Sequence, residues 1–299
     1  MAEPRHILIT GGAGQVGLEL QAHAWPDGVV VHAPGRDDLD LTDPVSVRAA
    51  FAARPYAAVI NAAAWTAVDK AEDAVADAFL ANAQGPAVLA EATRQAGVPL
   101  VHISTDYVFD GSANRPYVES DPVGPLGVYG ASKLAGELAI RSGNPRSVVL
   151  RTAWLISAHR ANFLKTMLTL AKKHERLAIV RDQIGCPTAA RDLTEALVSI
   201  TLRLMDDQDA PTGVYHFVNA GETSWAGLAR EIMASSRTTG GAWAEVDAIT
   251  TDQYPTPAKR PANSRLNTTK LSRDFGIQPR DWRAAVAEIV AELNKEIAR

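Results

Sequence analysis

Short apolar runs alternate with amphipathic stretches along the first half of the chain. The runs have the length and the Val and Ile content of buried strands, and they cover residues 6–10, 29–33, 57–61, 99–105 and 147–153. Stretches with helical periodicity lie between them, at residues 15–24, 44–53, 72–96 and 129–141. Such alternation is typical of a parallel sheet covered on both faces. The pattern therefore predicts an α/β fold with a doubly wound parallel sheet, whose ligand lies at the carboxyl ends of the strands.

The pattern is less regular after about residue 155. Helical periodicity appears near residues 161–173, 189–205, 224–235 and 281–297, and residues 215–219 resemble a strand. Loops rich in Pro and Thr cover residues 183–188 and 254–268. We expect a Rossmann-type dinucleotide-binding domain at residues 1–155. Residues 156–299 are expected to form a smaller C-terminal region that mainly binds substrate, and some of it could rejoin the first sheet.

Composition narrows the class of protein. The chain has 299 residues and a net charge of −4 without a basic tract, which disfavours nucleic acid as a partner. Cys186 is the only cysteine, so no intrachain disulfide can form and a reducing compartment is expected. The N-terminus lacks a signal-peptide pattern, and no apolar run approaches the ~18 residues of a membrane span. We therefore expect a soluble cytoplasmic protein.

The first predicted strand leads directly into a glycine-rich sequence, TGGAGQVG at residues 10–17. Two registers fit a dinucleotide fingerprint, one with Gly12, Gly14 and Gly17 and one with Gly11, Gly14 and Gly17. Both place glycine where the backbone turns tightly and approaches a pyrophosphate at a helix N-terminus. The sequence follows a strand and opens a helix, which is the context that the fingerprint requires.

The residues after the second and third strands bear on the choice of cofactor. Arg36 favours the 2′-phosphate of NADPH, whereas Asp37 and Asp38 leave NADH open. The residues that we expect to bind the cofactor are Gly11, Gly14, Gln15, Val16, Gly17, Arg36, Asp40, Leu41, Ala62, Ala63, Ala64, Tyr129 and Lys133. Asp40 and Leu41 could flank the adenine, and the small alanines would let the dinucleotide backbone approach.

A hydroxyl cluster follows the fourth strand, in the sequence STDYVFDG at residues 104–111. Tyr129 and Lys133 lie one turn apart on the next predicted helix. Reduction of a carbonyl needs a hydride donor and a proton donor, and Tyr129 can supply the proton. We expect Lys133 to lower the pKa of this phenol from about 10 and to bond the cofactor ribose. Thr105 can polarise the carbonyl oxygen.

Together these motifs resemble those of the extended short-chain dehydrogenases/reductases, and most closely the dTDP-4-dehydrorhamnose reductase family. The matching stretches are GAGQVG (12–17), NAAAWTAVDKAE (61–72), STDYVFDG (104–111), YGASKLAGE (129–137), RTAWL (151–155), DQIGCPT (182–188) and YPTPAKRPANSRLNT (254–268). The resemblance spans nearly the whole chain. It implies an oxidoreductase of dTDP-rhamnose biosynthesis, which uses a nicotinamide cofactor to reduce dTDP-6-deoxy-L-lyxo-4-hexulose to dTDP-L-rhamnose.

The resemblance also implies roles for individual residues. Catalysis falls to Thr105, Tyr129 and Lys133. The residues expected to bind the nucleotide sugar are Thr66, Val68, Thr105, Asp106, Tyr107, Trp154, Asn263, Ser264 and Arg265. Lys259 and Arg260 add cations for the sugar diphosphate, and Pro187 and Thr188 shape the pocket.

Four further residues have a structural interpretation beside a functional one. Lys70 and Glu72 either orient the pocket or cap the next helix. His102 is expected to be a hydrogen-bonded core histidine, and Cys186 is assigned no chemistry.

Some members of the family hold a divalent ion between carboxylates of two subunits. Glu19 and Glu292 match two of those positions, but Arg191 stands where that arrangement has a glutamate. A salt bridge is therefore expected in place of a metal, and the corresponding homodimer stays open.

Two alternatives to this function remain. One is reduction of another nucleotide-linked 4-ketosugar. The other is a non-catalytic, dinucleotide-binding regulatory subunit, like a relative that regulates methionine adenosyltransferase. Retention of Thr105, Tyr129 and Lys133 disfavours the regulatory role, because a binding module has no need of a proton donor.

Overall fold

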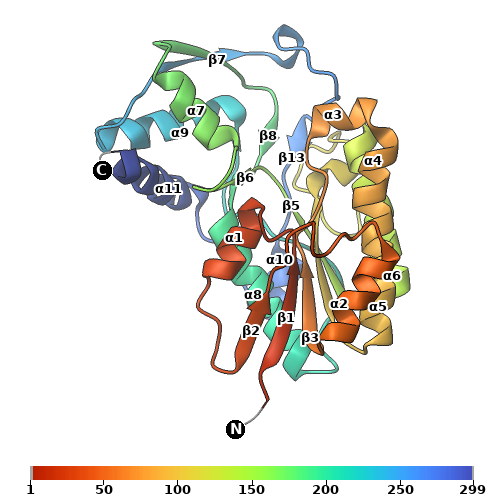
Figure 1. Cartoon of the computed structure of the whole chain (residues 1–299). Coiled ribbons are helices and arrows are strands. Elements are labelled where there is room, and N and C mark those ends of the chain that lie inside the picture. The colour runs from red at the N-terminus through yellow and green to blue at the C-terminus, as the bar shows by residue number, and fades with distance from the viewer. Residues whose placement is uncertain (1–2, 298–299) are drawn as a thin grey trace.

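The central sheet of the computed structural model, which describes residues 3–297, has six strands (Figure 1). They are β1 (Arg5–Thr10), β2 (Val29–His32), β3 (Tyr56–Asn61), β4 (Leu100–Thr105), β5 (Ser147–Thr152) and β10 (Gly213–His216). Their order is β10-β5-β4-β3-β1-β2, and every neighbouring pair is parallel. The predicted doubly wound parallel sheet is therefore confirmed, and a strand from the second half of the chain forms one edge.

Helices cover both faces of this sheet, because successive strand residues point to opposite sides. Ile7 and Ile9 of β1 pack on the side of α1 (Gln15–Ala22), α8 (Ala190–Asp206) and α10 (Thr269–Phe275). Leu8 packs on the other side, with α2 (Pro44–Ala53), α5 (Gly85–Gln95) and α6 (Val128–Gly143). The two layers of helices stand on opposite sides of the strands in Figure 1. Each face thus has its own apolar core.

The second half of the chain also builds a smaller region beyond the carboxyl ends of the strands (Figure 1). Its helices are α7 (Phe163–Ala171), α9 (Trp225–Thr238) and α11 (Trp282–Ile297). Its strands pair as β7 (Arg176–Val180) with β12 (Glu245–Ile249), β8 (Ile184–Gly185) with β11 (Thr223–Ser224) and β13 (Asn263–Ser264), and β6 (Leu155–Ile156) with β9 (Thr188–Ala189). One apolar cluster, which includes Trp154 and Trp282, forms its core. Residues 3–297 include two short 3-10 turns as well, η2 (Asp106–Val108) and η3 (Thr251–Gln253).

The helix predicted at residues 72–96 is wrong as a single element. The structure has α3 (Val68–Asp73), α4 (Val75–Phe79), a π-helical turn η1 (Leu80–Gln84) and then α5. The π-turn carries Asn82, whose amide bonds the backbone of Trp65 and the hydroxyl of Ser132. A Cβ at Gly136 of α6 would lie 2.0 Å from the carbonyl oxygen of Asn82. The turn therefore serves close packing against α6, which periodicity does not reveal.

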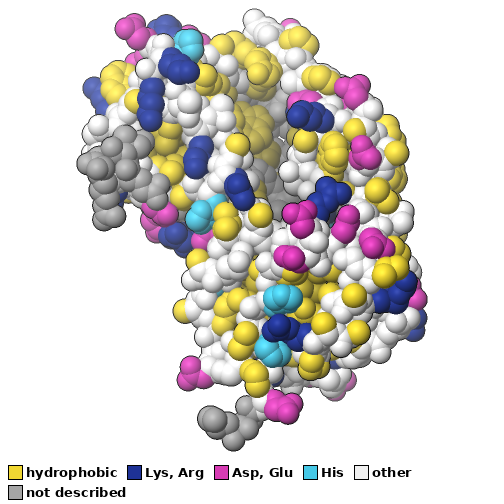
Figure 2. Space-filling model, viewed as in Figure 1, with side chains coloured by type: hydrophobic (Ala, Val, Ile, Leu, Met, Phe, Trp, Pro, Cys, Tyr) yellow, Lys and Arg dark blue, Asp and Glu magenta, His cyan; other side chains and the backbone are white. Residues whose placement is uncertain are grey.

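The space between the smaller region and the sheet domain is hollowed. Figure 2 shows this hollow between the smaller region and the lobe that carries α3 and α4, with hydrophobic side chains within it. It lies beyond the carboxyl ends of the strands, where a doubly wound sheet binds its ligand. No helix in the described chain is long and apolar enough to cross a membrane.

Candidate active site

The glycine-rich sequence forms a tight turn between β1 and α1. Gly11 has a φ of +72°, and a Cβ there would lie 2.6 Å from the backbone of Ala62. A Cβ at Gly17 would lie 2.3 Å from the carbonyl oxygen of Gly11. Only glycine fits these positions, and the turn leads directly into the N-terminus of α1. Such a cradle fits the pyrophosphate of a dinucleotide.

A loop of the smaller region, residues 157–162, lies on this glycine turn. Gln15 Oε1 accepts hydrogen bonds from Ser157 Oγ and from Asn162 Nδ2, each at 3.0 Å. Arg160 Nε donates to the carbonyl oxygen of Ala13 at 2.6 Å. Sequence reasoning missed this loop, because no motif marks it and it comes together with the turn only through the fold.

The residues expected at the adenosine end lie after β2. The side chain of Arg36 is 80% exposed and pairs with Asp40 at 3.9 Å. Hydrogen bonds from Thr42 lower the pKa of Asp40. The side chain of Leu41 is buried in the core beside α5, so only its backbone can flank an adenine. Arg36 is thus free to reach a ligand, whereas Leu41 is mainly structural.

A buried polar network connects β1, β3 and β4 with α6. Thr10 donates to Asn61 Oδ1 at 2.6 Å, and Asn61 Nδ2 lies 2.9 Å from His102 Nδ1. The other ring nitrogen of His102 is 3.5 Å from Lys133 Nζ. Burial and the nearby Lys133 charge hold the pKa of His102 well below its ordinary value. His102 is therefore a neutral core histidine, as predicted, and it also contacts a predicted catalytic residue.

The pKa shifts of Tyr129 and Lys133 differ from the prediction. Burial raises the pKa of Tyr129 to about 12, and burial lowers the pKa of Lys133 to about 8. Lys133 Nζ donates to the carbonyl oxygen of Ile103 at 2.7 Å. The ammonium is thus turned to the end of β4, and desolvation dominates at the phenol. The predicted lowering of the pKa of Tyr129 by Lys133 is wrong in this structure.

Thr105 and Asp106 lie at the carboxyl end of β4. Thr105 Oγ1 donates to Asp106 Oδ1 at 3.1 Å, whereas the buried Asp106 Oδ2 has no partner in the described chain. Burial raises the pKa of Asp106 to about 6, against the lowering effect of the nearby Ser264 and Thr105 hydroxyls. The ring of Tyr107 meets that of Tyr129 edge to face, with 5.4 Å between centroids. A buried acceptor without a partner, beside a phenol, fits a ligand that carries hydroxyl groups.

The basic loop at residues 254–268 is fixed by carboxylates. Arg260 Nη2 bonds Asp69 Oδ2 of α3 at 2.7 Å, and Arg265 Nη1 lies 3.2 Å from Glu222 Oε1. Asn263 uses its amide to hold the backbone of Ala113 and of residue 115. Arg260 and Arg265, two of the three cations predicted for a sugar diphosphate, are therefore paired within the protein. The contact of Asn263 with substrate stays a prediction.

Helix α3 holds two elements of the site at once. Asp69 binds the basic loop, and Glu72 Oε1 accepts a hydrogen bond from the backbone N–H of Val128 at 2.9 Å. Val128 begins α6, the helix that carries Tyr129 and Lys133, and a carboxylate is favourable at a helix N-terminus. Glu72 thus caps a helix, as one alternative proposed, but that helix is α6 rather than the next one in sequence.

Trp154 has an unusual backbone and a defined stacking partner. Its φ is +49°, and its ring stacks on Trp225 with 3.6 Å between centroids. A Cβ at Gly185 would lie 2.4 Å from this ring, so glycine is required there. Trp225 donates from Nε1 to Gln183 Oε1 at 3.2 Å. Sequence reasoning missed Trp225, because nothing in the local sequence indicates that it supports Trp154.

The predicted salt bridge at the metal position is confirmed. Arg191 Nε lies 3.5 Å from Glu19 Oε2, and Arg191 Nη2 lies 3.1 Å from Glu292 Oε2. Within residues 3–297 no group of three or more His, Cys, Asp or Glu side chains could hold a metal ion. The predictions about a metal and about the corresponding homodimer stay predictions.

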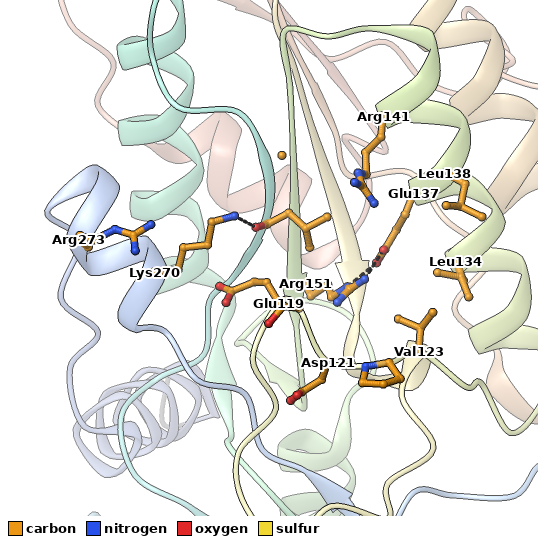
Figure 3. Close-up of a pocket in the computed structure, with 14 residues that line it drawn as sticks. Glu119, Asp121, Val123, Leu134, Glu137, Leu138, Arg141, Arg151, Lys270 and Arg273 are labelled. Carbon is orange, nitrogen blue, oxygen red and sulfur yellow. Dashed lines mark hydrogen bonds and ion pairs between the residues drawn. The ribbon is translucent and has the colours of Figure 1, made fainter.

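A separate cavity of about 690 Å³ lies between α6, α10 and the edge of the sheet at β10 (Figure 3). None of the predicted site residues lines it. At its wall Arg151 of β5 binds Glu137 of α6 through two hydrogen bonds, of 2.8 and 2.6 Å. Glu137 is one turn beyond Lys133, so this buried pair fixes α6 against the sheet. The cavity lies beside α6, and it is not the candidate active site.

Comparison with known proteins places the chain in a family. The family model described as RmlD substrate binding domain matches residues 5–295. A dTDP-4-dehydrorhamnose reductase of Sinorhizobium fredii is 42% identical over 288 residues, which cover 96% of this chain and 97% of that protein.

Solved structures agree with this match. The crystal structure of a dTDP-4-dehydrorhamnose reductase from Clostridium acetobutylicum has a TM-score of 0.89 and 40% identity, covering 96% of this chain and 99% of that one. A second such reductase, from Bacillus anthracis in complex with NADP, has a TM-score of 0.90 and 31% identity, covering 97% and 99%. The chain belongs to the dTDP-4-dehydrorhamnose reductase family.

Proposed function

We propose that this chain is an NADPH-dependent dTDP-4-dehydrorhamnose reductase. It reduces the C4 keto group of dTDP-6-deoxy-L-lyxo-4-hexulose and so gives dTDP-L-rhamnose. The observation that carries the proposal is the meeting of Tyr129, Thr105 and the Asp106 carboxyl at the carboxyl end of β4, where Asp106 Oδ2 has no hydrogen bond in the described chain. That end of the sheet is shared with the glycine cradle, so one ligand can reach both.

The cofactor is NADPH, with NADH as the second choice. The glycine turn tolerates no side chain at Gly11 or Gly17, so a pyrophosphate can approach its backbone closely. The relative from Bacillus anthracis was solved in complex with NADP. The exposed Arg36 is the residue that would meet a 2′-phosphate. When bound, the nicotinamide supplies the hydride for C4.

Tyr129 is the proton donor. With its pKa raised to about 12, the phenol is protonated at neutral pH and can give its proton to the C4 oxygen as negative charge develops there. On substrate binding, Thr105 turns its single hydroxyl proton from Asp106 Oδ1 to the same oxygen. Lys133, which is buried one helical turn from Tyr129 and has a pKa of about 8, holds the cofactor ribose.

The sugar and its diphosphate contact both halves of the chain. The side chains that we place around them are Thr66, Val68, Asp106, Tyr107, Trp154, Asn263, Ser264 and Arg265. Asp106 accepts a hydrogen bond from a sugar hydroxyl, which supplies the missing partner of its Oδ2. Trp154 is buried, with its ring against Trp225 and Gly185, so it meets the sugar only through the small part of its side chain that stays exposed.

The test is oxidation of NADPH in the presence of enzymatically generated dTDP-6-deoxy-L-lyxo-4-hexulose. Wild-type protein should turn over, and Tyr129→Phe should lose roughly 10²- to 10⁴-fold in kcat while it still binds NADPH. Equal turnover by Tyr129→Phe would remove Tyr129 from catalysis. A folded, NADPH-binding wild-type protein without turnover would point instead to another ketosugar or to a regulatory subunit.

A further inference from the structure

The loop at residues 157–162 does more than join the two halves of the chain. Several side chains of the described chain form hydrogen bonds with the glycine turn at residues 11–17. Among them, Arg160 is the one that carries a positive charge. It uses only Nε, and neither Nη atom of Arg160 has a partner among the described residues. The side chain is exposed, so a ligand can reach these two donors.

The backbone at Arg160 is unusual for an arginine. Its φ is +54°, and only Trp154 shares a positive φ among the non-glycine residues that the structure describes. A side chain in this region costs on the order of 1 kcal/mol, which glycine would avoid. The conformation directs the guanidinium to the glycine turn. Ser157 and Asn162 then hold the loop in place through Gln15.

The carboxylate nearest to this loop, Glu19, does not pair with Arg160, so the guanidinium can bind a ligand. Glu19 is the carboxylate that contacts this loop, through His159 at 3.6 Å. Arg191 pairs with Glu19 at 3.5 Å, so that carboxylate already has a cationic partner. A guanidinium can donate from Nε to one acceptor and from its Nη atoms to a second, a geometry that a lysine cannot reproduce.

We propose that Arg160 is a cofactor ligand contributed by the smaller region. Its Nη atoms bind the pyrophosphate of the dinucleotide while its Nε holds the carbonyl of Ala13. The loop at residues 157–162 therefore holds the cofactor against the glycine turn. This inference rests on the proposed function, because it requires that NADPH binds at that turn.

The test compares ligands with and without a pyrophosphate, measured by fluorescence titration of NADPH and NADH and by competition with adenosine 2′-monophosphate. Arg160→Gly removes the guanidinium but suits the positive φ, so the fold is kept. This variant should bind NADPH and NADH about tenfold more weakly, with unchanged affinity for adenosine 2′-monophosphate and an unchanged or higher Tm.

Arg36→Ala should show the opposite pattern, with weaker binding of NADPH and adenosine 2′-monophosphate but not of NADH. Arg48→Ala, an exposed change on α2, is the control that should alter neither. The inference is overturned if Arg160→Gly binds NADPH like wild type, or if it loses adenosine 2′-monophosphate to the same degree. A wild-type protein that binds neither dinucleotide would overturn the proposed function itself.

Discussion

In the proposed site, the cofactor side is the glycine turn at residues 10–17, and the substrate side comprises Asp106 and the basic loop at residues 254–268. Different kinds of contact hold these two sides. On the cofactor side the backbone packs against itself, and a Cβ at Gly17 would lie 2.3 Å from the oxygen of Gly11. On the substrate side ion pairs hold the basic loop, as between Asp69 and Arg260 at 2.7 Å. Close backbone packing tolerates no added atom, whereas a partly exposed ion pair can be lost at small cost. The two sides should therefore differ in their sensitivity to mutation, pH and salt.

The largest effect is expected on the cofactor side, from Gly17→Ala. The added methyl group meets a backbone carbonyl that cannot move without disturbing the turn, so stability should fall by roughly 3 kcal/mol and NADPH binding should be lost. Gly124→Ala is the matched control, because its Cβ would lie 3.6 Å from its nearest neighbour, in ordinary contact. Urea unfolding and NADPH titration measure both. If the two variants behave alike, close packing does not define the cofactor side.

The next effect is a pH dependence on the substrate side, from Asp106→Asn. Burial raises the pKa of Asp106 from 3.8 in the unfolded chain to about 6 in the folded protein. Between these two pH values the folded protein keeps the proton and the unfolded chain does not. The contribution of this group to the free energy of unfolding is therefore largest below about pH 4 and is lost as the pH rises through 6. At pH 8 the variant should be more stable than wild type by roughly 2–3 kcal/mol, with the difference gone below pH 4.

Asp110 provides the contrast for this experiment. Hydrogen bonds from Ser112 and Tyr117 lower the pKa of Asp110, so its contribution to stability is present above its unfolded pKa and is lost as the pH falls. Asp110→Asn should therefore destabilise the protein at pH 8. Unfolding curves collected from pH 4 to 8 test the two signs together. The same sign for both variants would refute the distinction between the two carboxyl groups.

The features that the sequence could predict are those that depend on residues close together in the chain. The glycine turn follows from residues adjacent in the chain, and the five strands of the first half follow from short apolar runs. The salt bridge of Arg191 was predictable because a single residue departs from the family pattern. These features depend on local sequence or on comparison of single positions with the family pattern.

The missed features depend on contacts between distant segments. Arg160 meets Ala13 across 147 residues, and Glu72 meets Val128 across 56. Strands β7 and β12 are half-exposed and form a separate two-stranded sheet, so neither has the apolar pattern of a core strand. The spacing of Tyr129 and Lys133 was correct, but their electrostatics depends on where the ammonium points. It donates to the carbonyl of Ile103, which only the fold reveals.

The smallest effect is expected from Asp69→Asn, which weakens the ion pair with Arg260. Because Asp69 is 41% exposed and Arg260 is 18% exposed, the loss should be about 0.5–1 kcal/mol. It should raise the KM for the nucleotide sugar about threefold at low salt and less at high salt, with an unchanged Kd for NADPH. Asp73→Asn on the same helix is the control, since that exposed carboxylate has no ion pair in the described chain. If Asp69→Asn weakens NADPH as much as the sugar, the two sides act as one unit. The coupling would then be expected to pass through Tyr107, because Tyr107 contacts both Arg260 and Tyr129 of α6.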